Sequence, residues 1–423
     1  MFNYLWQPRC SPRAINSLNI LKGKYYQCLR PHRNDSKMKI LEDVKVLDFT
    51  HVWFGPYCTM MLAGLGADVI TVEPPWGNIG RLGPGELYKG TSTTFMALNC
   101  GKKSITIDLK NPEGIALVKE LVKEADVVVQ NFTPGAMERL GLGYEELKKI
   151  KPNIIYAALS GFGQYGPYSK YGSYAVVAEA ISGHTYATGK GISEDHEPVT
   201  MAGALGDIGP GVFAAFSIVA ALRYRDKTGI GQMIDVNQVD TMVSFNGCDT
   251  VAYDLFKESP IERRRKRGRP PNELWGVIKV KDGWVQIAGS RPKAVEEMKS
   301  KLGVEEVTLD LVKEKLSTMT RKEAFEWLVS FDVPSAPIYE AYEGFDDPHL
   351  KARKTFIEVP HPIAGSYRIP KFPAEFSETP GEIKTGAIVL GQHTEEILKT
   401  VLKKTPKEIE ELEQNGVITI WRP

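Results

Sequence analysis

The chain alternates short apolar runs rich in β-branched residues with longer segments whose apolar residues recur at helical spacing. The short runs predict buried strands over residues 44–50, 67–75, 103–109, 125–132 and 152–163. The longer segments predict helices over residues 56–67, 111–125, 135–150 and 211–225. Strands that alternate with helices in this way predict a parallel, doubly wound, Rossmann-like sheet in a large α/β domain.

The pattern changes after residue 226. Residues 227–245 are typical of a strand that leads into a helix, residues 275–289 of a hairpin, and residues 295–331 of helices. The basic, proline-containing segment 258–273 predicts a solvated loop, with an anion-binding segment as the alternative. Together these features predict a smaller α+β domain.

The expected division of the chain therefore has four parts. They are a basic tail at 1–37, the N-terminal part of the large domain at 38–226, the small domain at 227–332, and a segment at 333–423 that returns to the large domain and ends in two helices.

The first 37 residues carry seven Lys or Arg residues and one acid, Asp35, without a continuous apolar stretch. This composition resembles a transit peptide, although a disordered tail from an upstream start codon explains it equally well. We therefore expect a cytoplasmic protein, or a mitochondrial one if residues 1–37 are a transit peptide.

Composition and motifs exclude several classes of function. The net charge is +1 and no run approaches the roughly 20 apolar residues of a spanning helix, so neither nucleic acid nor a membrane is an expected partner. The five cysteines form no CxxC pair, which favours a reducing compartment. The chain has no GxSxG or HExxH motif, and the loops that follow the strands have no GxGxxG or GxxxxGK[ST] motif. We therefore predict no metal and no permanently bound cofactor.

Reactive side chains are few. Cys58 and Cys100 are candidate thiol nucleophiles, but buried core cysteines are the more common finding at such positions. Asp207 is the single acid in the small-residue stretch 201–211, which contains four glycines. It either caps the helix that follows or is a reactive carboxylate that the glycines allow a ligand to approach closely.

Several ordered motifs resemble the class III CoA-transferases. These motifs are residues 44–75, 98–114, 131–147, 160–168, 203–207, 227–236 and 390–398, and they extend the resemblance from about Met38 to the C-terminus. The resemblance implies transfer of CoA from an acyl-CoA donor to a small carboxylic acid, with a CoA thioester as substrate. It also implies that Asp207, in a Gly-Asp step, forms an aspartyl covalent intermediate. The family's interlocked homodimer is expected as well, with residues 224–231 and 331–348 as connections.

The resemblance also assigns binding residues. The positions that match the family's CoA-contacting segments are His51, Val52, Trp53, Asn131, Phe132, Ala136 and Arg139, with Gly135 beside them. Tyr174 matches a tyrosine of the acyl site. From the sequence alone, Arg139 would be a helix-surface arginine and Phe132 a core aromatic.

The sequence departs from the formyl-CoA transferases at several positions. Pro74 replaces an arginine that helps to hold CoA, with Arg81 as a candidate substitute, and Trp53 replaces a glutamine. The glycine-only loop of the small domain is missing. These changes point away from oxalate and formate and toward a larger carboxylate.

Two alternatives remain open. The same family contains α-methylacyl-CoA racemases, which pair the aspartate with a histidine in a Gly-His-Asp step. Here that step is Ser173-Tyr174-Ala175, which lacks an imidazole for the second proton transfer. The other alternative is a non-catalytic CoA-binding subunit of a heteromeric transferase.

Overall fold

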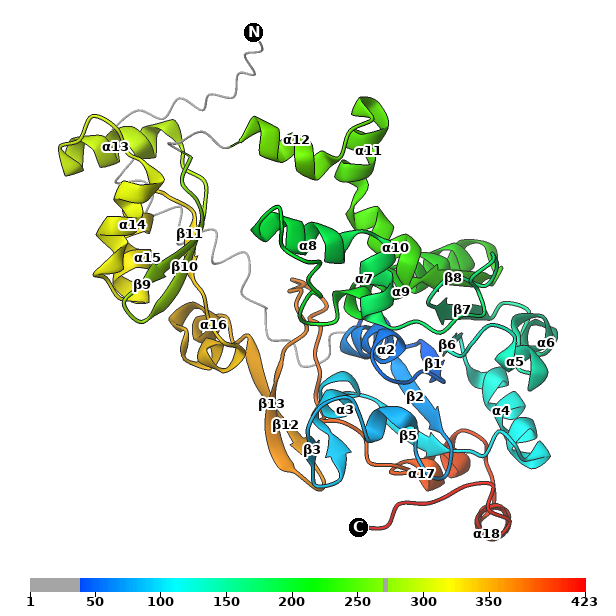
Figure 1. Ribbon diagram of the computed structural model, residues 1–423. Helices are drawn as coiled ribbons and strands as arrows, with labels where there is room; N and C mark the ends of the chain where they lie inside the picture. The colour runs from blue at the N-terminus through cyan, green and yellow to red at the C-terminus, as the bar shows by residue number, and fades with distance from the viewer. Residues whose placement is uncertain (1–38, 269–272) are drawn as a thin grey trace. The chain divides into compact units, whose positions relative to one another are not determined.

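The computed structural model describes residues 39–268 and 273–423 (Figure 1). The expected basic tail at 1–37 lies outside these residues. The chain forms two compact units, one that extends to Gly247 and resumes at Ile357–Pro423, and a second at Cys248–Phe356. The expected boundaries lay after residues 226 and 332. The first limit differs because residues 233–237 pair with the large sheet, and the second because residues 335–337 pair with residues 285–287 of the second unit.

The first unit contains a parallel six-stranded sheet with the strand order β5-β2-β1-β6-β7-β8 (Figure 1). Its strands are β1 (Lys45–Asp48), β2 (Asp68–Glu73), β5 (Lys103–Thr106), β6 (Val127–Gln130), β7 (Ile155–Ser160) and β8 (Met233–Asn237). This arrangement confirms the predicted α/β class. Most of these strands are buried on both faces, which explains why they appear as continuous apolar runs.

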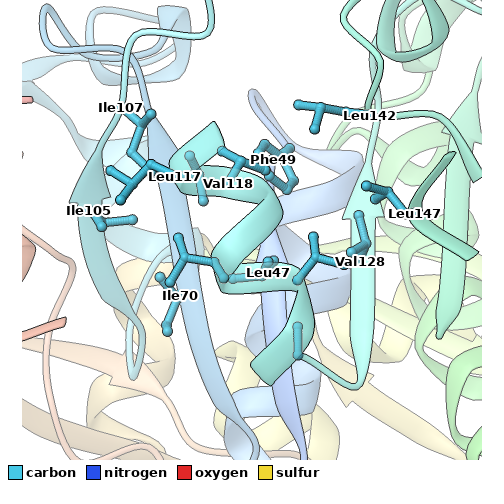
Figure 2. Close-up of a cluster of buried hydrophobic side chains, with 14 of the residues drawn as sticks. Leu47, Phe49, Ile70, Ile105, Ile107, Leu117, Val118, Val128, Leu142 and Leu147 are labelled. Carbon is cyan, nitrogen blue, oxygen red and sulfur yellow. The ribbon is translucent and has the colours of Figure 1, made fainter. Parts of the chain in front are cut away.

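Neighbouring residues of a strand point into two different cores. Leu47 packs in the core covered by α4 (Pro112–Glu124), α6 (Tyr144–Ile150), α17 (Thr394–Thr400) and α18 (Pro406–Gln414). Figure 2 shows the apolar side chains of this cluster between α4 and the sheet. Val46 packs in the other core, against α2 (Phe54–Gly64) and α9 (Leu205–Thr228). Helices on both faces make the sheet doubly wound.

Local signals set several element boundaries. The Asn111 side chain accepts a hydrogen bond from the Glu113 amide and Pro112 is the first residue of α4, as the sequence predicted. The expected single helix over 135–150 is instead two, α5 (Ala136–Arg139) and α6, because the chain turns at Gly141, where φ is +67°.

Helix α9 differs from the expectation in both length and apolarity. The helix begins at Leu205 rather than at Gly211, so Asp207 lies in its first turn. It continues through Thr228, so residues 224–228 belong to the helix and not to the expected connection. Within the described part of the chain it is the one helix long and apolar enough to cross a membrane by length and composition. The expectation that no segment reaches this apolarity is therefore wrong. Burial explains the apolarity, because 56% of the helix's most apolar window is buried and the helix packs against α2.

The remaining elements of the first unit are short. They are η2 (Ile79–Arg81), β3 (Leu87–Tyr88), β4 (Thr91–Ser92), α3 (Thr93–Leu98), α7 (Ala175–Ile181), α8 (His184–Ile192), α10 (Gln238–Phe245), β12 (Phe356–His361) and β13 (Gly365–Pro370).

The second unit is the predicted small α+β fold. Strands β9 (Trp275–Val280) and β10 (Gly283–Ala288) form the expected hairpin, and β11 (Ser335–Pro337) pairs with β10. Its helices are α11 (Gly247–Phe256), α12 (Pro260–Arg267), α13 (Pro292–Leu302), α14 (Leu309–Ser317), α15 (Arg321–Val329), η3 (Ala341–Asp346) and α16 (Pro348–Ala352). This unit has an apolar core of its own.

The expected loop at 258–273 was predicted wrongly over its first half. Ser259 caps α12 and Pro260 is its first residue, so the basic residues lie on a helix. Arg and Lys are good helix formers, so a run of positive charge does not by itself indicate a loop.

Candidate functional site

Asp207 lies where α9 begins beside α7. The residue before the helix, Ala204, has a left-handed φ of +50°, which turns the chain sharply into the first turn. A Cβ atom on Gly206 would lie 2.4 Å from the carbonyl oxygen of Ala175, so only glycine permits this approach. The Asp207 residue is 7% exposed. The N-cap of α9 is Ala204 and no side chain caps the helix, so Asp207 is a first-turn acid rather than the predicted cap, and the reactive interpretation stays open.

A polar relay holds the Asp207 carboxylate. Gln238, the first residue of α10, donates from Nε2 to Asp207 Oδ1 at 2.5 Å. The Ser173 hydroxyl donates to Gln238 Oε1 at 2.8 Å, which fixes the orientation of the amide. Sequence reasoning missed Gln238, because only the fold brings β8 and α10 beside α9.

A second carboxylate, Glu179 of α7, lies fully buried behind Asp207. Its Oε1 accepts a hydrogen bond from the Gly206 amide at 2.9 Å, and its Oε2 has no hydrogen-bond partner among the residues that the structure describes. The Gly206 amide is thus already engaged and is not free to bind a developing oxyanion. No local motif marks Glu179, and the sequence prediction missed it as well.

Burial raises the pKa of Asp207 to about 7, and the charge of Glu179 adds to the rise. The hydrogen bond from Gln238 acts in the opposite direction, because it stabilises the carboxylate. A carboxyl group with this pKa is present in both protonation states near neutral pH, as is common for groups that act in catalysis.

The predicted CoA segments form a clamped loop beside this aspartate. The Asn131 side chain accepts from the His51 amide at 3.0 Å and donates to the His51 carbonyl at 2.9 Å. Val52 has a left-handed φ of +69°, a strained conformation for a β-branched residue. The Phe132 ring contacts the His51 ring at 5.4 Å between centroids, and burial lowers the pKa of His51. The loop is therefore held rigidly, with a neutral imidazole.

Two cavities meet at Asp207. A narrow one of about 90 Å³ is lined by His51, Val52, Trp53, Phe54, Asn131, Leu159, Ser160, Gly161, Ser173, Tyr174, Asp207 and Gln238. A larger one of about 590 Å³ is lined by Val52, Trp53, Ile79, Leu82, Gly83, Pro84, Tyr174, Ala175, Val176, Ala204 and Asp207. Most of the predicted site residues are thus brought together. Phe132 reaches the site through His51, whereas Ala136 and the exposed Arg139 line neither cavity.

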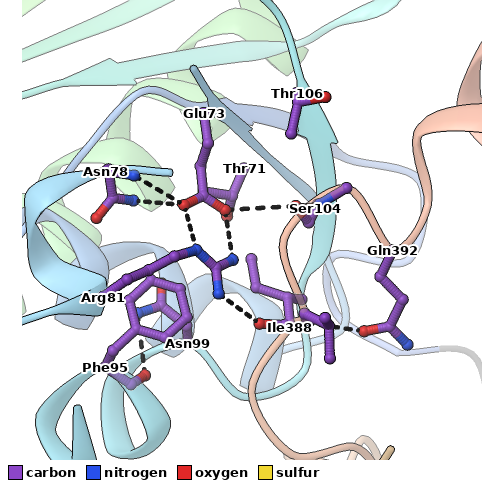
Figure 3. Close-up of polar contacts among 12 residues, drawn as sticks. Thr71, Glu73, Asn78, Arg81, Phe95, Asn99, Ser104, Thr106, Ile388 and Gln392 are labelled. Carbon is purple, nitrogen blue, oxygen red and sulfur yellow. Dashed lines mark hydrogen bonds and ion pairs between the residues drawn. The ribbon is translucent and has the colours of Figure 1, made fainter. Parts of the chain in front are cut away.

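Arg81, the candidate substitute for the arginine that Pro74 replaces, is already paired. Its Nε and Nη2 donate to the two Glu73 oxygens at 2.7 and 2.6 Å, and its Nη1 donates to the Ile388 carbonyl (Figure 3). The guanidinium also lies 4.2 Å from the centre of the Phe95 ring. With Glu73 fully buried, Arg81 holds the η2 loop rather than a ligand phosphate.

The thiol alternatives do not fit the structure. Cys58 and Cys100 are fully buried, and burial raises the pKa of both thiols, to about 11 for Cys100. A thiol with a raised pKa is a poor nucleophile. Within residues 39–268 and 273–423, no group of three or more His, Cys, Asp or Glu residues is placed to hold a metal ion.

The family model described as CoA-transferase family III matches residues 41–394. The chain belongs to CoA-transferase family III. Membership confirms the resemblance found in the sequence and makes this protein a CoA-transferase.

Curated relatives of this family III chain cover nearly all of it. The formyl-CoA:oxalate CoA-transferase of Streptomyces coelicolor is 33% identical, covering 90% of this chain and 99% of its own. The succinyl-CoA:glutarate CoA-transferase of Mus musculus is 34% identical, covering 92% of each. The succinyl-CoA–L-malate CoA-transferase beta subunit of Chloroflexus aurantiacus is 31% identical, covering 89% of this chain and 98% of its own.

A solved structure supports the family III fold. The crystal structure of a CAIB/BAIF family protein from Brucella suis matches with a TM-score of 0.75 and 30% identity, covering 86% of this chain and 99% of its own.

Proposed function

We propose that this family III enzyme transfers CoA from an acyl-CoA to a carboxylic acid, with Asp207 as the covalent nucleophile. The observation that carries the proposal is the position of the Asp207 carboxylate in the shared wall of the two cavities. A carboxylate is a weak nucleophile, so it needs close placement and exclusion of water. Its burial and the hydrogen bond from Gln238 meet both needs.

The proposed reaction has four steps that balance. The Asp207 carboxylate attacks the thioester carbonyl, the C–S bond breaks, and a mixed anhydride forms with CoA thiolate leaving. The thiolate attacks the aspartyl carbonyl, which releases the donor acid and leaves an aspartyl-CoA thioester. The acceptor carboxylate attacks this thioester and expels the thiolate to form a second anhydride. The thiolate then attacks the acceptor carbonyl, which yields the new CoA ester and the free Asp207 carboxylate.

The other predicted site residues are assigned to the CoA and acyl parts of the substrate. The rigid loop at His51–Trp53 with Asn131 lies on the narrow cavity, which suits the CoA arm next to the thioester. Phe132, Ala136 and Arg139 follow Asn131 in the sequence, and the exposed guanidinium of Arg139 suits a CoA phosphate. Tyr174 lies in the walls of both cavities, beside the acyl group.

One observation keeps racemisation as the second candidate. His51 lines the same narrow cavity as Asp207, so an imidazole does lie near the carboxylate although the sequence step lacks one. A racemase would exchange the α-hydrogen of an acyl-CoA for deuterium without any acceptor acid. A transferase would not.

The transfer is tested by trapping. Protein incubated with acyl-CoA and then treated with hydroxylamine or borohydride should carry the modification on Asp207, as read by peptide mass spectrometry. Asp207→Asn should show neither adduct nor transfer, while Asp195→Asn, at an exposed aspartate, should behave as the unaltered protein. Full transfer by Asp207→Asn would contradict the proposal.

The homodimer expected from the resemblance is also proposed here. Large apolar side chains are exposed along α9 and α10, among them Val212, Phe213, Phe216, Val243 and Phe245. An apolar surface of this kind is typical of a protein interface. The alternative is the heteromeric subunit, which would bind CoA and stay inert until a paralogous chain is added.

A further inference from the structure

We propose that the larger cavity at Asp207 takes an uncharged, apolar acyl group, so that one substrate acid is a branched aliphatic or aromatic monocarboxylic acid. This inference rests on the proposed function and concerns the part of the substrate beyond the reacting carbonyl. It separates this chain from its relatives named for oxalate, glutarate and malate, which are all dicarboxylic acids.

The cavity wall is apolar, and much of it is exposed. Ile79 and Leu82 are 66% and 73% exposed, and Val176, which also lines the cavity, is about half exposed. Large apolar side chains that face a cavity beside a reactive group are typical of a ligand site, because ligand binding removes their surface from water. Among the lining residues, Asp207 is the one Asp, Glu, His, Lys or Arg, and Tyr174 and Trp53 are the other side chains with a polar atom.

Charge decides against a dicarboxylic substrate. Among the described residues that line this cavity, none is Lys, Arg or His. The nearest guanidinium in the wall loop, that of Arg81, is held by Glu73 and the Ile388 carbonyl. The distal carboxylate of a succinyl or glutaryl group would lose water here without gaining a cation, and it would face the Asp207 charge. Burial of an unpaired charge is strongly unfavourable.

Size and shape favour a bulky group. A volume of about 590 Å³ is far more than a formyl or oxalyl group fills. Trp53, which stands where formyl-CoA transferases have glutamine, lines the cavity with Tyr174. Aromatic walls contact a flat or branched apolar group over a large area. The cavity therefore selects by apolar contact rather than by ion pairing.

The test measures acylation of Asp207 in the purified full chain, by peptide mass spectrometry and by rapid quench. Isovaleryl-, hexanoyl- and benzoyl-CoA are compared with oxalyl-, succinyl- and glutaryl-CoA. We expect second-order acylation rates at least about tenfold higher for the apolar esters. Equal or faster acylation by the dicarboxylic esters, still at Asp207, would overturn this inference and leave the transferase intact. No adduct with any ester, or an adduct elsewhere, would overturn the proposed function and this inference together.

A charge-introducing variant gives the second arm. Leu82→Arg places a cation at an exposed position of the cavity wall, where the long side chain needs no repacking of the core. We expect glutaryl-CoA to gain at least about tenfold relative to hexanoyl-CoA. Leu87→Arg is the matched control, because Leu87 is an exposed leucine that does not line this cavity, and its selectivity should be unchanged. An unchanged ratio in Leu82→Arg would place the acyl group elsewhere.

Discussion

At the scale of single residues, the site rests on a carboxyl group that the fold makes costly to ionise. Asp207 is buried, next to the fully buried Glu179, with Gln238 as its hydrogen-bond donor. Desolvation keeps it partly protonated at neutral pH, whereas the nucleophilic attack that we propose needs the anion. Once formed, that anion is poorly solvated and therefore more reactive toward a carbonyl.

The first prediction is a pH dependence. Because burial raises the pKa of Asp207 to about 7, the fraction of carboxylate grows as pH rises through that value. Single-turnover acylation should therefore increase between about pH 5 and pH 8 and then level off. Rapid-quench measurements in buffers of constant ionic strength test this. A rate that is flat over the whole range would contradict it.

The second prediction concerns Glu179 as a positioning residue. Glu179→Gln keeps an oxygen acceptor for the Gly206 amide but removes a charge that adds to the rise in the pKa of Asp207, whose main cause is burial. The midpoint of the pH profile should move to lower pH, with the plateau rate nearly kept. Glu179→Ala also removes the acceptor and should lower the plateau rate. If Glu179 only fills space in the core, Glu179→Gln would leave the midpoint of the pH profile unchanged.

At the scale of elements, the site is made by close approach of helix ends. The first turn of α9 packs on the start of α7, and α10 contacts both helices. The third prediction tests this. Gly206→Ala would push a Cβ atom to 2.4 Å from the Ala175 carbonyl oxygen, so α9 and Tyr174 must separate. We expect acylation to fall by more than about a hundredfold.

Gly172→Ala is the control for this substitution. Gly172 lies two residues before Tyr174, and a Cβ atom there would have no neighbour within 4 Å. Acylation by this variant should match that of the unaltered protein. An equal loss of acylation in both variants would show that acylation depends on the loop around Gly172 and Tyr174 rather than on the contact between α9 and α7.

The fourth prediction concerns the η2 loop, which supplies Ile79 to the larger cavity. Arg81→Met leaves the Glu73 carboxylate buried without its cation and should destabilise the protein by about 3 kcal/mol. Adding Glu73→Gln removes the unpaired charge, so the double variant should regain part of this loss. Denaturant unfolding measures both. A double variant less stable than Arg81→Met would contradict the role of Arg81 as the partner of the buried Glu73 carboxylate.

At the scale of the whole molecule, the chain forms two units with separate cores, and the first leaves an apolar surface on α9 and α10. The fifth prediction is that Phe216→Asp prevents the proposed homodimer from forming, so that the variant is a monomer. Phe216 is 69% exposed, so the change should not disturb the fold of one chain. Light scattering after size-exclusion chromatography measures the mass. Val329→Asp, at an exposed valine of α15, is the control and should leave the mass unchanged.

The sequence predicted some features of the fold correctly and others wrongly. Strands β1, β2, β5, β6 and β7, the Asn111 cap and the β9–β10 hairpin were predicted correctly, because each depends on residues close together in the chain. The start of α9 was misplaced, since glycines and Pro210 stand in its first turns and normally weaken a helix. Packing of these small residues against α7 and α10 overrides that preference.

The sequence by itself determined the family and the doubly wound sheet, and it singled out Asp207, the residue that we propose as the nucleophile. Only the tertiary structure decided what surrounds that residue. Glu179 reaches Gly206 across 27 residues and Gln238 reaches Asp207 across 31. Arg81 is withdrawn from ligand binding by Glu73 and Ile388. Periodicity reports which face of an element is buried, but contacts between distant elements depend on packing in three dimensions, and these contacts set the charge and shape of the cavity.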